Sequence, residues 1–195
     1  LKYSTNEQHG IGTDSTILET LNQWYDKNLS SVSNYIDSSI GFCSDREMAN
    51  GSVWSPKPSK EIYYAPYERI IDQSNPTLNC TNTNDILKTS IGLITADEAM
   101  YAGVAYFESI KGNYLYTGES YWTMTPYFID GDTWSEDFYM RSSGGLGSDD
   151  VFYRYGVRPV INLKADTLFM GTGTSTDPFT CLLYTSPSPR DYAAS

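Results

Sequence analysis

Acidic and aromatic side chains gather in the segment between residues 127 and 155. Its centre, "DGDTWSED", places four carboxylates around one tryptophan. Carboxylates accept hydrogen bonds from sugar hydroxyls or pair with basic side chains, and aromatic rings offer apolar area with a polar tip. We therefore predict a ligand-binding surface in this segment. Its candidate residues are Tyr127, Asp130, Asp132, Trp134, Glu136, Asp137 and Tyr139.

Trp134 is the expected anchor of that surface, because it lies in a polar Gly/Asp/Ser loop and not in an alternating apolar run. The carboxylates could instead hold Ca²⁺, which prefers oxygen ligands, with Asp149 and Asp150 following nearby. The spacing of an EF-hand loop is absent. The segment is more typical of a solvated acidic loop, and we predict neither a metal nor a cofactor.

Residues for catalysis are scarce. His9 is the only histidine, so a zinc site built on histidines is excluded. No Ser or Cys pattern accompanies it to suggest a catalytic triad. Asp97 and Glu98 could be catalytic carboxylates, but acids at a helix start are usually electrostatic caps. The sequence predicts no enzyme.

Two helices should support the candidate surface. Residues 14–29 carry apolar side chains at helical spacing, with Asp14, Ser15 or Thr16 as N-cap and a capping box of Thr16 and Glu19. Trp24 and Tyr25 of this helix are expected in the core. A second helix follows Thr95, whose capping box would use Glu98 and whose C-terminal glycine would be Gly103.

Strands are expected after residue 112. "NYLYTG" should pair with "SYWTMTP" across a turn, and "DFYMRS" should pair with "DVFYRY" across a glycine cluster. "YGVRPVINL" should form a last strand, in which Pro159 would lie at an edge, at an end or in a bulge. Trp122 is expected in the core, and Arg158 is expected to pair with a carboxylate or with backbone carbonyls. Long irregular loops fill residues 44–61 and 73–85. The fold class is therefore α+β, with two helices and a small twisted antiparallel sheet.

Three of these stretches resemble one architecture. "GLITADEAMYAG" is similar to a helix of formylglycine-generating enzymes, "YWTMTP" to their core tryptophan strand, and "GVRPVINL" to their closing strand. The resemblance implies a C-type lectin-like fold. "DSTILETLNQWYDKNL", "GFCSDREMANGS", "YLYTGESYWTMTP" and "GTGTSTDPF" also resemble an uncharacterised family of secreted proteins from gut Firmicutes, some of them fused behind a prepilin-like segment.

This resemblance implies an extracellular or cell-surface location and a binding module similar to an adhesin, whose ligand would be a glycan, a host protein or a neighbouring surface protein. A structural subunit of a type IV pilus-like assembly is the alternative. A relative of formylglycine-generating enzymes is the second alternative, but their working cysteines lie near the C-terminal end, where the domain has none. The resemblance also implies an N-terminal strand upstream of Leu1, without which "GVRPVINL" would have an unpaired edge.

Cys43 and Cys80 lie in irregular segments and, in a secreted domain, are expected to form a disulfide. Free buried thiols or a catalytic pair are the alternatives. The last cysteine, Cys181, opens a segment, residues 181–195, that resembles a translated sequencing adapter. We expect that segment to be non-native and residues 1–180 to form a single domain.

The overall charge limits the partners. The chain has 24 acidic and 13 basic residues, for a net charge of −11. An acidic surface repels phosphate backbones and anionic lipid, so nucleic acid is not an expected partner. No apolar run approaches the roughly 18 residues of a membrane span, and we expect no membrane insertion.

Overall fold

The structure is a computed structural model that describes residues 14–55, 57–131, 134–174 and 176–181. Packing divides the chain into two compact units, Leu1–Asn162 and Leu163–Ser195. His9 and Asp132 lie outside the described residues, as does most of the segment 181–195. The two units are described separately below.

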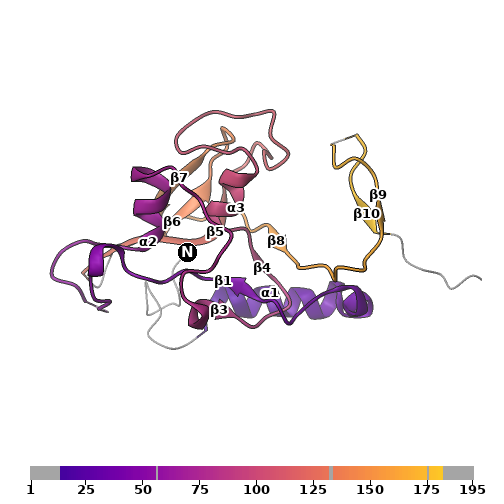
Figure 1. Cartoon of the computed structure of the whole chain (residues 1–195), viewed down its shortest axis with the longest axis horizontal. Coiled ribbons are helices and arrows are strands. Elements are labelled where there is room, and N and C mark those ends of the chain that lie inside the picture. The colour runs from indigo at the N-terminus through magenta and orange to yellow at the C-terminus, as the bar shows by residue number, and fades with distance from the viewer. Residues whose placement is uncertain (1–13, 56, 132–133, 175, 182–195) are drawn as a thin grey trace, which may run out of the picture. The chain divides into compact units, whose positions relative to one another are not determined.

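The first unit mixes helices with a curled antiparallel sheet, as the predicted α+β class requires (Figure 1). Its helical elements are α1 (Thr16–Asn28), η1 (Ser30–Tyr35), η2 (Ala49–Gly51), α2 (Ala65–Tyr67), η3 (Glu68–Asp72), η4 (Thr83–Asp85) and α3 (Ala96–Tyr101). Its strands are β1 (Phe42–Cys43), β2 (Ile62–Tyr63), β3 (Ile86–Leu87), β4 (Gly92–Leu93), β5 (Tyr121–Asp130), β6 (Trp134–Met140), β7 (Leu146–Asp150) and β8 (Pro159–Val160).

The main sheet has the strand order β2-β5-β6-β7, and all its neighbours are antiparallel. Strand β5 is the longest and is bent, because its pairing with β6 shifts register on both sides of Pro126. Proline has no N–H to give to the ladder, so an irregularity at this position is expected. Two short ladders, β1 with β3 and β4 with β8, complete the unit.

Hydrophobic side chains pack on both faces of the main sheet. One cluster joins α3 to the sheet through Ala96, Ala99, Phe138 and Met140. The other joins α1 and β4 to the sheet through Leu21, Ile91, Leu93 and Trp122. Trp122 is 1% exposed, which confirms its predicted place in the core.

Helix α3 begins and ends as predicted. Thr95 accepts a hydrogen bond from the Glu98 N–H, and the Glu98 carboxylate accepts one from the Thr95 N–H, so the capping box is present. Gly103, just past the helix, has a positive φ of 88°, a conformation that glycine adopts without steric cost.

Helix α1 differs from its prediction in two respects. Its N-cap is Ser15, which accepts from the Leu18 N–H, so the expected Thr16–Glu19 capping box is wrong. Trp24 is 45% exposed and not in the core. Only a narrow face of α1 meets the sheet, centred on the buried Leu21, and Trp24 lies outside that face.

Two expected strand pairings are also wrong. Residues 113–118 form turns, because Asn113 accepts from the Leu115 N–H and donates to the Ala102 carbonyl, which satisfies these backbone groups locally. The partner of β6 is β7, which ends at Asp150, before most of "DVFYRY". There the Asp150 carboxylate accepts from the Phe152 N–H and turns the chain out of the sheet.

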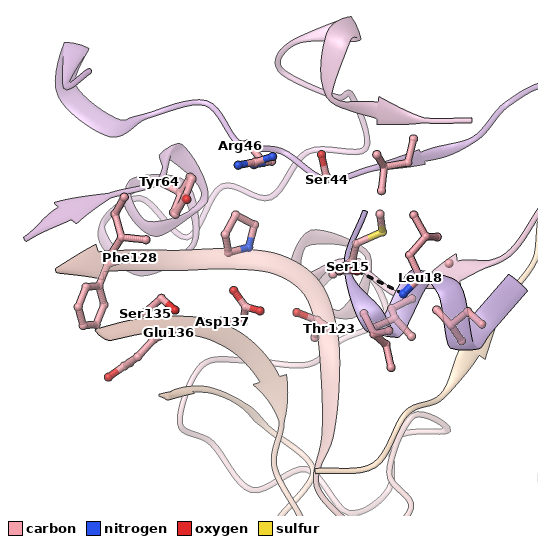
Figure 2. A pocket seen from close by; sticks show the side chains of 18 of the residues that line it. Ser15, Leu18, Ser44, Arg46, Tyr64, Thr123, Phe128, Ser135, Glu136 and Asp137 are labelled. Atoms are coloured by element: carbon pink, nitrogen blue, oxygen red, sulfur yellow. Dashed lines mark hydrogen bonds between the residues drawn. The ribbon is translucent and has the colours of Figure 1, made fainter. Parts of the chain in front are cut away.

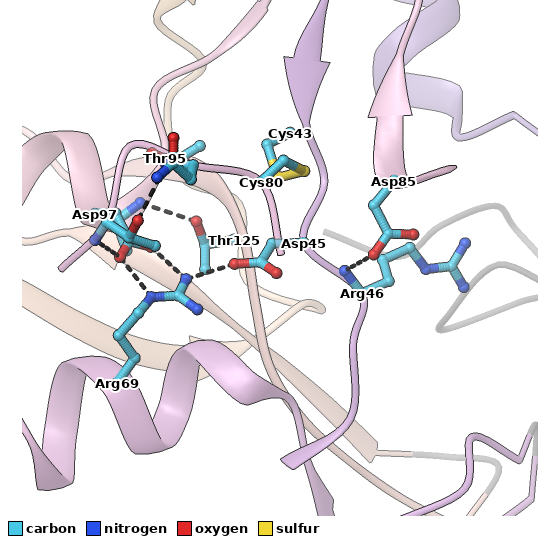
Figure 3. Close-up of polar contacts among 12 residues, drawn as sticks. Cys43, Asp45, Arg46, Arg69, Cys80, Asp85, Thr95, Asp97 and Thr125 are labelled. Carbon is cyan, nitrogen blue, oxygen red and sulfur yellow. Dashed lines mark hydrogen bonds and ion pairs between the residues drawn. A yellow bond between two sulfur atoms is a disulfide. The ribbon is translucent and has the colours of Figure 1, made fainter. Parts of the chain in front are cut away.

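Two cross-links tie the loops of the first unit together (Figure 3). Cys43 and Cys80 form the predicted disulfide, with their Cα atoms 5.5 Å apart. Beside it, the Arg69 guanidinium contacts the carboxylates of Asp45 and Asp97, both 4% exposed. Burial alone would lower the pKa of Arg69. The hydrogen bonds and charges of the two carboxylates have the larger, opposite effect, so the pKa lies above its ordinary value. Asp97 thus has a structural partner.

Arg158 is also structural, as predicted. Its Nη1 donates to the Leu115 carbonyl at 3.1 Å and to the Tyr121 hydroxyl at 3.3 Å. The strand that follows it, β8, pairs with β4, and Pro159 faces Leu93 in that short ladder.

The second unit contains one described hairpin. Strands β9 (Phe169–Met170) and β10 (Thr180–Cys181) pair antiparallel. The rings of Phe169 and Phe179 meet edge to face with centroids 5.0 Å apart.

No helix among the described residues is long and apolar enough to cross a bilayer.

Candidate ligand-binding surface

The registers of β5, β6 and β7 determine which candidate side chains meet. Because side chains alternate between the faces of a strand, Ser135, Asp137 and Tyr139 lie on one face of β6, and Trp134, Glu136 and Phe138 lie on the other. Asp137 lies opposite Asp149 on β7, and Tyr139 lies opposite Gly147. A Cβ at this position would lie 2.9 Å from the Tyr139 ring, so the glycine gives that ring room to lie against β7.

Three tyrosines form a stack that we call the tyrosine stack: Tyr139, Tyr155 and Tyr153. The rings of Tyr139 and Tyr155 are 4.7 Å apart with planes at 22°, and those of Tyr155 and Tyr153 are 6.0 Å apart with planes at 10°. The buried Trp122 ring supports the stack, 5.0 Å from Tyr155. The stack therefore runs from the core to the surface, where Tyr153 is 56% exposed.

A carboxylate fixes the middle ring of the stack. The Tyr155 hydroxyl donates a hydrogen bond to Oδ2 of Asp149, and the other Asp149 oxygen accepts from the Asp150 N–H at 3.0 Å. Burial and the hydrogen bond to Asp149 raise the pKa of Tyr155. The hydroxyl therefore stays protonated at neutral pH and can act as a donor.

The tyrosine stack forms part of the wall of an open hollow of about 460 Å³. Its lining residues are Trp122, Val151, Phe152, Tyr153, Arg154, Tyr155 and Val157. The Val151 N–H donates to the Ser135 carbonyl, which holds the start of this segment against β6. Phe152 and Tyr153, which follow, are exposed.

The structure separates the residues that the sequence grouped as a binding surface. Tyr127 is half-buried and packs on Phe138, with ring centroids 5.0 Å apart. Tyr139 lies against the opposite cluster, with Trp122. Asp130 is half-buried and pairs with Trp134 at the end of the β5–β6 ladder. Asp132 lies outside the described residues.

Trp134 is 50% exposed, as expected for a residue in a polar loop. Glu136 is half-buried on the same face of β6, and burial raises its pKa despite hydrogen bonds from Ser148 and Trp134. Asp137 points to the other face, into a cavity between the sheet and α1 (Figure 2). The predicted residues therefore contribute to different surfaces.

Asp137 has a raised pKa. Burial raises it to about 6, although nearby positive charges, Arg46 among them, lower it. Among the residues that the structure describes, no three His, Cys, Asp or Glu side chains converge as metal ligands would.

Sequence reasoning placed Tyr153 and Tyr155 on one face of "DVFYRY" but missed their stacking with Tyr139. Their two-residue spacing in "DVFYRY" was a usable signal, since it places them on one side of an extended chain. It did not reveal Tyr139 as the third member, because that contact depends on the β6–β7 register. Arg46 and Tyr64, which line the same cavity as Asp137, carried no sequence signal.

No protein-family model, curated protein or solved structure matches the chain.

Proposed function

We propose that this protein is an extracellular or surface-attached carbohydrate-binding module that uses the exposed end of the tyrosine stack as its platform. The observation that carries the proposal is the parallel arrangement of Tyr153 and Tyr155, supported from below by Tyr139 and Trp122. An exposed ring is usually free to rotate, whereas this one is preorganised by stacking. Preorganisation lowers the entropy cost of binding.

The chemistry of the surface suits a sugar. One face of many pyranose rings presents C–H groups, which pack against the π face of a tyrosine. The hydroxyls at the rim of the sugar need hydrogen-bond acceptors, and the half-buried carboxylates of Asp149 and Asp150 lie next to the stack. Such carboxylate hydrogen bonds are stronger than neutral ones.

The extracellular location is supported by the Cys43–Cys80 disulfide, since disulfides persist mainly in oxidising compartments. We also propose that the first unit is C-type lectin-like. The support for this is a helix on each face of a curled antiparallel sheet, together with the resemblance of "GLITADEAMYAG" and "GVRPVINL".

A glycan array probed with the full chain tests the proposal, followed by titration calorimetry with the best sugar. Tyr153→Ala should weaken binding about tenfold or more, the effect of losing a stacked aromatic contact of roughly 1.4 kcal/mol. Tyr114→Ala is the matched control, because Tyr114 is an exposed tyrosine of the same unit that is not part of the stack. Equal affinity of the two variants, or an array without any bound glycan, would contradict the proposal.

A further inference from the structure

A cavity between α1 and the main sheet is separate from the tyrosine stack. Its volume is about 160 Å³ (Figure 2). An apolar cavity of about 150 Å³ accepts a molecule the size of benzene. The space is therefore large enough for a small organic molecule but too small for a sugar chain.

One part of the cavity is apolar. Leu18 and Leu21 of α1 face Leu93 of β4 and Met124 of β5 across it. Leu21 and Leu93 are each 5% exposed, so this part of the wall is formed by the core itself. An aliphatic group of a ligand placed here would leave water for an apolar environment, which favours binding by about 0.8 kcal/mol for each buried CH₂ group.

Another part of the cavity wall carries three charged residues, Arg46, Glu136 and Asp137, of which Glu136 points away from Asp137 (Figure 2). Asp137 projects from β6, and Arg46 projects from the loop after β1, on the other side of the bend in β5 (Figure 2). Both side chains are half-buried. They interact electrostatically, since Arg46 lowers the pKa of Asp137. Arg46 is itself positioned by a hydrogen bond with the buried hydroxyl of Tyr64.

Two hydroxyl groups of the wall already donate to backbone carbonyls. Thr123 Oγ1 donates to the Phe138 carbonyl at 2.7 Å, and Ser44 Oγ donates to the Asp85 carbonyl at 2.8 Å. They can accept hydrogen bonds but have no proton left to donate. Recognition of a ligand's charged groups therefore falls to Arg46 and Asp137.

We propose that this cavity binds a free α-amino acid with an apolar side chain, of the size of leucine or methionine. Asp137 accepts hydrogen bonds from the ammonium group, Arg46 donates to the carboxylate, and the side chain lies among Leu18, Leu21, Leu93 and Met124. Charge-assisted hydrogen bonds of this kind are the stronger class. The proposal does not rest on carbohydrate binding at the tyrosine stack.

Titration calorimetry on the full chain tests the proposal with four probes: L-leucine, L-methionine, N-acetyl-L-leucine and L-leucinamide. The first two should bind. N-acetylation removes the ammonium group and amidation removes the carboxylate, so each derivative should bind about tenfold or more weakly, the loss expected for one hydrogen bond to a charged group. Failure of both amino acids to bind, or equal affinity for either derivative, overturns the proposal.

Three variants assign the charges to residues. Asp137→Asn and Arg46→Gln should each weaken L-leucine binding about tenfold. Glu47→Gln, which changes an exposed carboxylate next to Arg46, should leave the affinity unchanged. Leu18→Trp fills the cavity from α1 and should abolish binding while both charges remain. Unchanged affinity in Asp137→Asn or Leu18→Trp places the ligand elsewhere and also overturns the proposal.

Discussion

The hydroxyl of Tyr155 donates a hydrogen bond to Oδ2 of Asp149, a residue at the end of β7 that lies opposite Asp137 on β6. This bond orients the middle ring of the tyrosine stack. Tyr155→Phe removes the bond but keeps the ring, so it should lower the free energy of unfolding by about 1 kcal/mol, the usual net value of a hydrogen bond. Urea denaturation measures this. A loss above about 3 kcal/mol would mean that the hydroxyl supports more than the orientation of one ring.

Trp134→Ala should leave the free energy of unfolding within about 1 kcal/mol of the parent, because the side chain is half exposed at the start of β6. Trp122→Ala is the matched variant, and loss of this buried ring should cost about 3–5 kcal/mol. Thermal or urea unfolding of both variants makes the comparison. If Trp134→Ala proves as destabilising as Trp122→Ala, the end of the β5–β6 hairpin is part of the scaffold and not a free surface.

Asp137 makes the stability of the protein depend on pH. Its pKa in the folded state is about 6, above the ordinary value of 3.8, so the folded state holds its proton more tightly than the unfolded state does. The contribution of Asp137 to the free energy of unfolding is therefore full below pH 3.8 and is lost as the pH rises through 6. The loss between pH 4 and pH 7 should be about 2–3 kcal/mol.

Asp137→Asn tests this dependence, because asparagine has no proton to lose. Denaturation of the parent and the variant at pH 4 and at pH 7 should show that the variant gains stability relative to the parent at the higher pH. A difference that is the same at both pH values would show that Asp137 does not titrate in this range.

The buried charge cluster around Arg69 should be costly to break. Arg69→Met leaves the buried carboxylates of Asp45 and Asp97 without their cation, which should cost about 3–5 kcal/mol. Lys111→Met is the control for loss of an exposed positive charge and should cost less than about 0.5 kcal/mol. Equal effects of the two variants would contradict a structural role for the cluster.

The Cys43–Cys80 disulfide spans 37 positions of the sequence. Removing it by a Cys43→Ser/Cys80→Ser double substitution should lower the free energy of unfolding by about 3–4 kcal/mol, the chain-entropy value for a loop of this length. Peptide mapping without reductant should recover the linked pair from exported protein. Two thiols that react with alkylating agents in the folded protein would refute the link.

The sequence by itself determined the features whose causes are local. Helix α3 could be predicted with both ends, because Thr95 and Glu98 cap each other three residues apart and Gly103 follows the last turn. The core position of Trp122 was expected from the resemblance of "YWTMTP" to a core tryptophan strand, and the disulfide was expected from two cysteines in a domain predicted to be secreted.

Only the tertiary structure decided the features that depend on strand register and on how much of a helix the sheet covers. Trp24 fits the helical period of its apolar neighbours, yet it is exposed because the sheet covers only a narrow face of α1. Tyr139 stacks on Tyr155, and Gly147, opposite Tyr139 in the β6–β7 ladder, gives the Tyr139 ring room to lie there. Asp137 and Arg46 line the same cavity although 91 positions of the sequence separate them. Such contacts join residues that are distant in sequence, so no local pattern specifies them; they arise when the chain packs.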